Sequence, residues 1–149
     1  MDKHARILIV DDEESATDTM KAILESEGYV VDRAITGKEA IKKSEETVYN
    51  LVLSDNRLPD MEGMELLKLM KEAVPRTRKV MVAGCPTMHN VILALNKNAD
   101  AYLVKPIDFE KLLNIVKEQL QLQADERKYG GMKVAEFIES RVKELRTNF

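Results

Sequence analysis

The stretch ILIVDD, residues 7–12, decides how this chain folds. Four consecutive apolar residues without polar alternation are typical of a strand covered on both faces, and two aspartates follow directly. Similar short apolar runs recur along the chain, at 29–31, 51–53, 80–82 and 102–104. Because helical patterns separate these runs, the sequence predicts an α/β fold: one doubly wound parallel sheet of five strands with helices on both faces.

The segments between the runs carry the signals of helix ends. Gly28 suits the left-handed end of a first helix, and Thr36 with Glu39 has capping-box spacing for a second. Thr87 is expected to cap a fourth helix and Asp108 a fifth. The apolar positions of the third and fifth helices repeat at helical spacing: Met64, Leu67, Met70, Phe109, Leu112, Leu113, Val116 and Leu120.

A further helical pattern follows the pair Gly130-Gly131. Its apolar residues recur at spacings of three and four, namely Ala135, Ile138, Val142, Leu145 and Phe149. We therefore expect one domain over residues 1–122 and a C-terminal helical extension over 123–149. Three interpretations of the extension are open: a helix packed on its own domain, a dimerisation helix, or a fragment of something longer.

Composition excludes several classes of protein. A length of 149 residues, with 44% hydrophobic and 33% charged residues, fits one globular domain. A net charge of -3 lacks the basic footprint of a nucleic-acid binder, so we expect no direct binding to nucleic acid. The single cysteine, Cys85, cannot form an intrachain disulfide and favours a reducing compartment. Without an apolar leader or a spanning segment, the sequence predicts a cytoplasmic protein that does not insert into membranes.

Charged side chains follow three of the apolar runs. Asp11 and Asp12 follow the first run, Asp55 follows the third after one serine, and Lys105 follows the fifth. In a parallel sheet these positions share the carboxyl edge, where open α/β folds bind their ligands. If the first and third strands are neighbours, their backbones lie about 4.8 Å apart, near enough for the three carboxylates to share one ion. The pattern therefore predicts a site for a hard cation.

Mg²⁺ fits such a site best, because it takes oxygen ligands and usually relies on one or two carboxylates plus phosphate oxygens. Asp55 is then the candidate nucleophile, and the ammonium group of Lys105 is expected to neutralise either a phosphate oxygen or the carboxylate of the nucleophile before reaction. A simpler interpretation is open for Asp11 and Asp12 alone: acids at the start of a helix can act only as caps.

Three motifs carry a resemblance to a known family: ILIVDDEE at 7–14, LVLSDNRLPDMEG at 51–63 and ADAYLVKP at 99–106. In this order and at these spacings, residues 5–122 resemble the receiver domain of two-component response regulators. The resemblance implies the flavodoxin-like strand order 2-1-3-4-5.

The resemblance also implies roles for individual residues. Asp55 would be the phosphoacceptor and Lys105 the switch lysine. Asp11, Asp12 and Asp55 would hold Mg²⁺, together with the backbone carbonyl of Arg57. A histidine kinase or phosphotransfer protein would donate the phosphoryl group, and the surface of the fourth helix, fifth strand and fifth helix would contact a downstream protein or a second copy in a homodimer.

The sequence departs from the family pattern at one position. Receivers usually carry Thr or Ser 22 residues before the switch lysine, and here that residue is Ala83. The small residue that follows is present as Gly84, and Tyr102 fills the aromatic switch position. By resemblance, Pro106 after Lys105 is expected to follow a cis peptide bond.

The sequence allows more than one consequence of Ala83. Ser54 and Thr87 are both candidates to supply the missing hydroxyl, and Tyr102 is either a switch residue or a core aromatic. Losing a hydrogen bond to a charged group costs about 1.5–3 kcal/mol, so phosphorylation can survive while its coupling to the output surface weakens.

Three functions compete on these grounds. The first is a response regulator without a separate output domain, a phosphoacceptor and not a turnover enzyme. The second is a receiver-like adaptor whose switching is weakened or lost at Ala83. The third, a small Mg²⁺ phosphatase, is disfavoured because Asn56 and Arg57 follow Asp55 where that class carries nucleophile-x-Asp.

Overall fold

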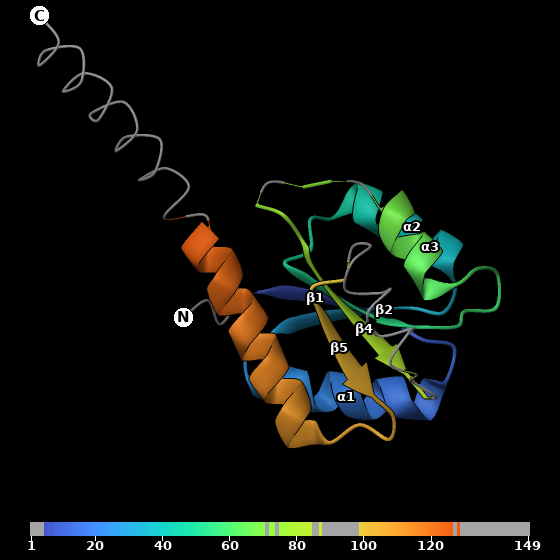
Figure 1. Ribbon diagram of the computed structural model, residues 1–149, viewed down its shortest axis with the longest axis horizontal. Helices are drawn as coiled ribbons and strands as arrows, with labels where there is room; N and C mark the ends of the chain where they lie inside the picture. The colour runs from blue at the N-terminus through green and yellow to red at the C-terminus, as the bar shows by residue number, and fades with distance from the viewer. Residues whose placement is uncertain are drawn as a thin grey trace, which may run out of the picture.

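The computed structural model describes residues 5–70, 72–73, 75–84, 87, 99–126 and 128. Its sheet has the order β2-β1-β3-β4-β5, and every neighbouring pair is parallel, so the predicted fold and strand order are confirmed (Figure 1). The strands are β1 (Arg6–Val10), β2 (Val30–Ala34), β3 (Leu51–Asp55), β4 (Arg78–Ala83) and β5 (Ala101–Val104).

Helices cover both faces of this sheet. The named helices are α1 (Glu14–Ser26), α2 (Gly37–Glu46) and α3 (Gly63–Leu69), and residues 109–126, called the C-terminal helix below, are also helical. Figure 1 shows α2 and α3 on one face and α1 with the C-terminal helix on the other. The helix expected from Thr87 and the pattern after Gly130-Gly131 lie outside the described residues.

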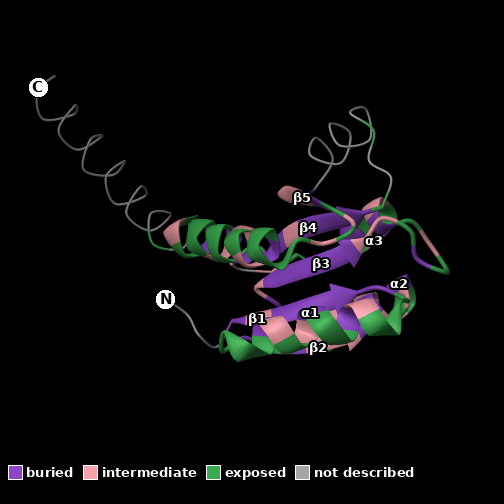
Figure 2. Cartoon of the chain, turned by 90° about the horizontal axis from the view of Figure 1, so that it is seen from below, coloured by how far each residue is buried: buried purple, intermediate pink, exposed green. Residues whose placement is uncertain are grey.

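The strands divide their side chains between two apolar cores. In β1, Ile7 and Ile9 join the core under α1 and the C-terminal helix, whereas Leu8 and Val10 join the core under α2 and α3. All four are fully buried (Figure 2). A strand covered on both faces has no solvent side, which is why its sequence shows an apolar run without alternation.

The edge strand β2 differs from the sequence-based expectation. The apolar run at 29–31 predicted its start, but the strand runs from Val30 to Ala34 and includes Asp32 and Arg33. Both polar residues are half-buried. An edge strand tolerates such residues because part of it faces water, so its polar half carried no apolar signal.

The predicted helix signals act much as expected, with one change. Gly28 has a φ of 95°, and the hydroxyl oxygen of Thr36 accepts the backbone N–H of Glu39 at 3.1 Å. The Glu39 carboxylate accepts the N–H of Ile35, one residue before the position of a standard capping box. A carboxylate oxygen of Asp108 accepts the N–H of Glu110 at 3.0 Å.

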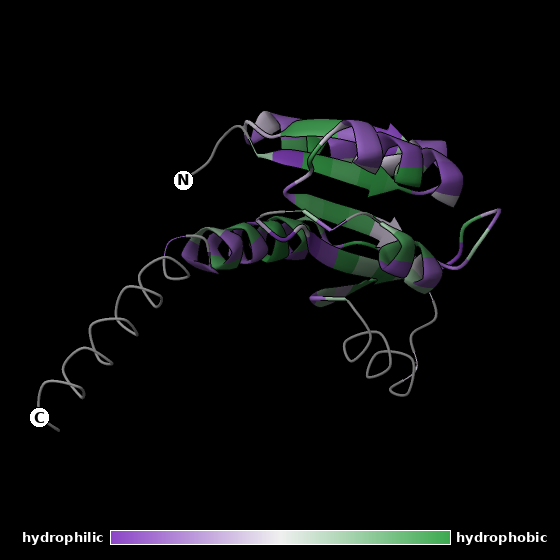
Figure 3. Ribbon diagram, turned by 90° about the horizontal axis from the view of Figure 1, so that it is seen from above, coloured by the Kyte–Doolittle hydropathy of each residue, from purple (hydrophilic) through white to green (hydrophobic). Residues whose placement is uncertain are grey.

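Hydropathy follows the same layering. Figure 3 shows apolar strands between helices whose outer faces are largely hydrophilic. Among the residues that the structure describes, no helix combines the length and apolar character needed to cross a bilayer.

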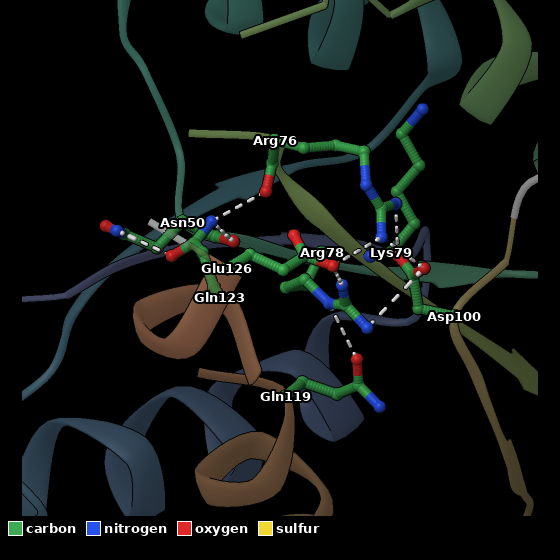
Figure 4. Close-up of polar contacts among 8 residues, drawn as sticks. All are labelled: Asn50, Arg76, Arg78, Lys79, Asp100, Gln119, Gln123 and Glu126. Carbon is green, nitrogen blue, oxygen red and sulfur yellow. Dashed lines mark hydrogen bonds and ion pairs between the residues drawn. The ribbon is translucent and has the colours of Figure 1, made fainter. Parts of the chain in front are cut away.

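A polar network ties the C-terminal helix to the amino end of the sheet (Figure 4). Arg78, the first residue of β4, is 6% exposed, and its guanidinium donates to the side chains of Gln119 and Glu126 at 2.9 Å each. One further turn along, the amide of Gln123 donates to the backbone oxygens of Asn50 and Arg76. The helix is therefore held by polar contacts as well as by its apolar stripe.

Candidate functional site

The carboxyl edge of the sheet brings together the four charged residues expected there. Asp11 follows β1, Asp55 is the last residue of β3, and Lys105 follows β5. One carboxylate oxygen each of Asp11, Asp12 and Asp55 can be chosen so that all three atoms lie within 4.8 Å of one another. The strand order explains this convergence, because β1 and β3 are neighbours and their carboxyl ends coincide.

Lys105 reaches two of the three carboxylates. Its ammonium Nζ lies 3.2 Å from Oδ2 of Asp11 and 3.2 Å from Oδ2 of Asp55. Three carboxylates against one ammonium leave the cluster with two negative charges in excess. Such an excess in a partly buried site favours a bound cation or a protonated carboxyl.

Burial and neighbouring charges shift the pKa values of Asp55 and Lys105. Burial raises the pKa of Asp55, and the nearby charge of Asp11 raises it further; Lys105 and the backbone N–H of Arg57 lower it, but the net pKa is raised. For Lys105, burial lowers the pKa, but the charges of Asp11 and Asp55 outweigh burial, so the net pKa is raised. These shifts favour the charged form of Lys105 and disfavour the ionised form of Asp55.

The two aspartates after β1 occupy different environments. Asp11 is 4% exposed, and its Oδ1 accepts the backbone N–H of Glu13 at 2.9 Å. Asp12 is exposed. The N-cap of α1 is Glu13, whose own side chain makes no capping bond. The interpretation of these acids as simple helix caps thus accounts for one oxygen of Asp11 and leaves its contact with Lys105 unexplained.

The loop of residues 56–62 connects Asp55 to α3 and carries Arg57. Its ends are closed by the N–H of Gly63, which donates to the carbonyl of Asn56 at 2.8 Å. Inside it, Arg57 and Glu62 form an isolated antiparallel bridge, and the N–H of Leu58 donates to the carbonyl of Met61. The 56–62 loop is therefore a small hydrogen-bonded unit beside the carboxylates.

Sequence reasoning missed two residues around this loop, Asp60 and Gly63. The carboxylate of Asp60 accepts the backbone N–H groups of Gly37 and Lys38, and Gly63 packs against the backbone of Asp55. The signals were present in part: a glycine just before an apolar helical pattern, and an aspartate after a proline. Neither signal indicates which residue Asp60 or Gly63 contacts, because these contacts form only when the chain has folded.

The residues assigned to switching differ in how far they are buried. Ala83 is fully buried, and its carbonyl accepts the N–H of Lys105 at 2.8 Å. Tyr102 is partly buried against the core under α2 and α3, and burial raises its pKa. Gly84 is exposed, and the Lys105–Pro106 peptide bond is cis as expected.

Ser54 is poorly placed to replace the hydroxyl that Ala83 lacks. The side chain is fully buried, and its hydroxyl donates to the backbone carbonyl of Asp55 at 3.1 Å. Thr87 is described, but most of the segment around it is not.

Comparison with known proteins identifies relatives of this chain. The family model of the response regulator receiver domain matches residues 7–117. The transcriptional regulatory protein ZraR of Klebsiella oxytoca is 37% identical over 114 residues, which are 76% of this chain and 26% of ZraR. The response regulator ArlR of Staphylococcus saprophyticus is 31% identical over 118 residues, 79% of this chain and 53% of ArlR. The chain thus spans about a quarter and about half of these relatives.

Solved structures match over most of the chain as well. A CheY-like receiver domain protein from Methanospirillum hungatei is 45% identical, with a TM-score of 0.75, and the match covers 83% of this chain and 98% of that one. The beryllofluoride-activated receiver domain dimer of NtrC4 is 35% identical, with a TM-score of 0.74 and coverage of 79% and 98%.

Proposed function

The chain belongs to the response regulator receiver domain family of two-component systems, and on that basis we propose that Asp55 accepts a phosphoryl group from a histidine kinase or a phosphotransfer protein. The observation that carries the proposal is the convergence of three carboxylates and Lys105 at one edge of the sheet. Receiver domains typically act in signalling, and we propose that this chain is a phosphoacceptor without substrate turnover of its own.

The chemistry follows from the position of Asp55. An oxygen of its carboxylate attacks the phosphorus of a phosphohistidine. The P–N bond breaks, and its electron pair leaves with the imidazole nitrogen, which takes up a proton. Lys105, held as a cation 3.2 Å from Asp55, balances charge on the phosphoryl oxygens. Water later hydrolyses the acyl phosphate and restores the carboxylate.

The donor atoms of the site fit Mg²⁺. All of them are oxygens, and three carboxylates within 4.8 Å suit a small, hard cation. We propose Asp11, Asp12, Asp55 and the backbone carbonyl of Arg57 as its protein ligands. When bound, Mg²⁺ supplies positive charge that relieves the repulsion among the carboxylates and the transferring phosphoryl group.

Signalling would pass through protein contacts. Phosphorylation adds about −1.5 to −2 charge at one point, which a two-state element must sense. We propose Ala83, Gly84, Tyr102 and Pro106 as the switch residues, and a downstream protein or a second copy as the partner. Residues 1–122 would form the receiver domain, and residues 123–149 an extension whose first turn contacts that domain.

The single cysteine, Cys85, favours a reducing compartment, and we therefore propose that the protein is cytoplasmic.

Labelling with acetyl phosphate tests the phosphoacceptor directly. With Mg²⁺ present, intact-mass spectrometry is expected to find one phosphate on the wild type and none on Asp55→Asn. Asp18→Asn is a suitable control, because Asp18 lies on α1 and contacts Arg33 at the protein surface. Labelling that persists in Asp55→Asn would refute the assignment.

An amide spectrum with beryllofluoride, a mimic of the phosphoryl group, tests signalling separately. Shifts that extend from Asp55 to Tyr102 and the C-terminal helix are expected of a working regulator. Shifts confined to the residues around Asp55 would contradict a role in signalling while leaving the binding site intact.

A further inference from the structure

Asp60 joins two elements that lie far apart in the sequence. Its Oδ1 accepts the backbone N–H of Gly37 at 2.8 Å, and its Oδ2 accepts the N–H of Lys38 at 3.0 Å. These are the first two residues of α2, where backbone N–H groups lack partners within the helix. Both oxygens of one exposed carboxylate are thus used to attach the 56–62 loop to α2.

A second contact strengthens this attachment. A Cβ atom on Gly37 would lie 2.4 Å from the sulfur of Met61, so the Met61 side chain occupies the space that a larger residue at 37 would need. Asp60 and Met61 therefore contact the same residue of α2 through polar and apolar groups respectively. The start of α2 acts as a fixed support for this part of the loop.

The support is transmitted to Arg57 by the loop itself. Leu58 and Met61 are joined by a backbone hydrogen bond, and Arg57 pairs with Glu62. These bonds connect the backbone of Arg57 to the part of the loop that Asp60 attaches to α2. In the proposed function, that backbone supplies a carbonyl ligand to Mg²⁺.

We propose that Asp60 is a positioning residue for the metal site, which holds the carbonyl of Arg57 in place by attaching the 56–62 loop to the first two residues of α2. The inference rests on the proposed function, because the position of the Arg57 carbonyl matters only if Mg²⁺ binds to it. It differs from that function in assigning a role to a side chain that is not itself a ligand of the ion.

A carboxylate suits this task better than an amide. It offers two acceptor oxygens and no donor, and a negative charge at the start of a helix is favourable. In Asp60→Asn one oxygen is replaced by an NH₂ group, which cannot accept an N–H. At least one of the two bonds to α2 is lost, while the size of the side chain is unchanged.

Calorimetric titration with Mg²⁺ alone tests the proposal. Groups that orient metal ligands typically change affinity by about 10–100-fold when mutated, and we expect Asp60→Asn to bind Mg²⁺ about tenfold more weakly than the wild type. Amide shifts on adding Mg²⁺ should change at Asn56, Arg57 and Leu58, whereas the spectrum of the strands should show that the fold is retained.

Two control variants separate positioning from simpler effects. Thr36→Ala removes the other cap of α2, a bond to Glu39 that does not involve the loop, and should leave Mg²⁺ affinity within about twofold. Glu62→Gln removes a negative charge from the same loop, where the Glu62 side chain makes no capping bond. It measures the loss of affinity that charge alone produces.

The outcomes distinguish this proposal from the function on which it rests. A loss in Asp60→Asn that clearly exceeds the loss in both controls supports the positioning role. Equal losses in Asp60→Asn and Glu62→Gln, or an unchanged affinity in Asp60→Asn, overturn it and leave the metal site standing. A wild type that fails to bind Mg²⁺ overturns the metal site and the role of Asp60 together.

Discussion

Gly63 packs directly against the backbone of Asp55: a Cβ atom at position 63 would lie 2.2 Å from the carbonyl oxygen of Asp55. No side chain fits that gap, and the nearest group is backbone and cannot rotate away. The first residue of α3 is therefore constrained by the residue proposed to accept the phosphoryl group.

Gly63→Ala is expected to destabilise the protein by about 1–3 kcal/mol, the usual cost of forcing extra volume into a packed site. Because the displaced group belongs to Asp55, beryllofluoride binding should weaken as well. Urea unfolding followed by circular dichroism measures the first effect. Gly84→Ala is the matched control, since a Cβ atom there meets open space and the change should stay within about 1 kcal/mol. Equal stability of the two variants would contradict the steric argument.

The raised pKa of Asp55 predicts how stability depends on pH. The folded protein holds this proton more tightly than the unfolded chain, so the stabilisation due to the protonated form is lost as pH rises from the unfolded pKa through the folded one. Above both values the ionised carboxylate costs free energy. Without Mg²⁺, Asp55→Asn should therefore be more stable than the wild type near neutral pH.

Thermal unfolding in the presence of a chelator measures this difference. It should shrink as the pH falls through the pKa of Asp55, and Mg²⁺ should raise the melting temperature of the wild type more than that of Asp55→Asn. A variant that is less stable than the wild type at every pH would show that burial is not the dominant influence on Asp55.

Arg78 should matter to the C-terminal helix beyond its own strand. Arg78→Met leaves Gln119 without a guanidinium donor and removes the shortest contact of Glu126, so we expect a loss of roughly 2 kcal/mol. Hydrogen exchange should quicken most over residues 119–126. Lys117→Met is a control, because the Lys117 ion pair with Glu27 is long and exposed and should contribute less than about 1 kcal/mol. Uniform exchange along the helix would rule out a local anchor.

Ala83→Thr should strengthen the coupling between Asp55 and Tyr102. The hydroxyl would stand at the buried end of β4, next to Lys105, whose backbone already bonds to residue 83. With beryllofluoride present, the Tyr102 amide should shift further in Ala83→Thr than in the wild type, and Ala83→Val should not reproduce the gain, since valine has a similar shape without a hydroxyl. Identical shifts in all three proteins would mean that the switch does not use this position.

Much of the fold and of the charged cluster was predictable from the sequence. A buried parallel strand has no solvent side, so β1, β3 and β4 appear as apolar runs, and residues that follow such strands must share one edge. That rule places Asp11, Asp55 and Lys105 at the same edge, and the strand order then brings them close together. The apolar pattern covers only the start of β2, because an edge strand can include polar residues such as Asp32 and Arg33.

The sequence by itself determined the kind of sheet and the chemistry gathered at its edge, because both follow from local periodicity and from strand ends. Only the tertiary structure decided which groups contact one another around the site and along the C-terminal helix: Asp60 with Gly37 and Gly63 with Asp55 near the carboxyl edge, and Arg78 with Gln119 at the amino end of the sheet. Each pair depends on how helices and loops pack. The type of a residue, such as glycine or aspartate, shows which contacts it is able to make, but the residue that it contacts is decided only when the chain has folded.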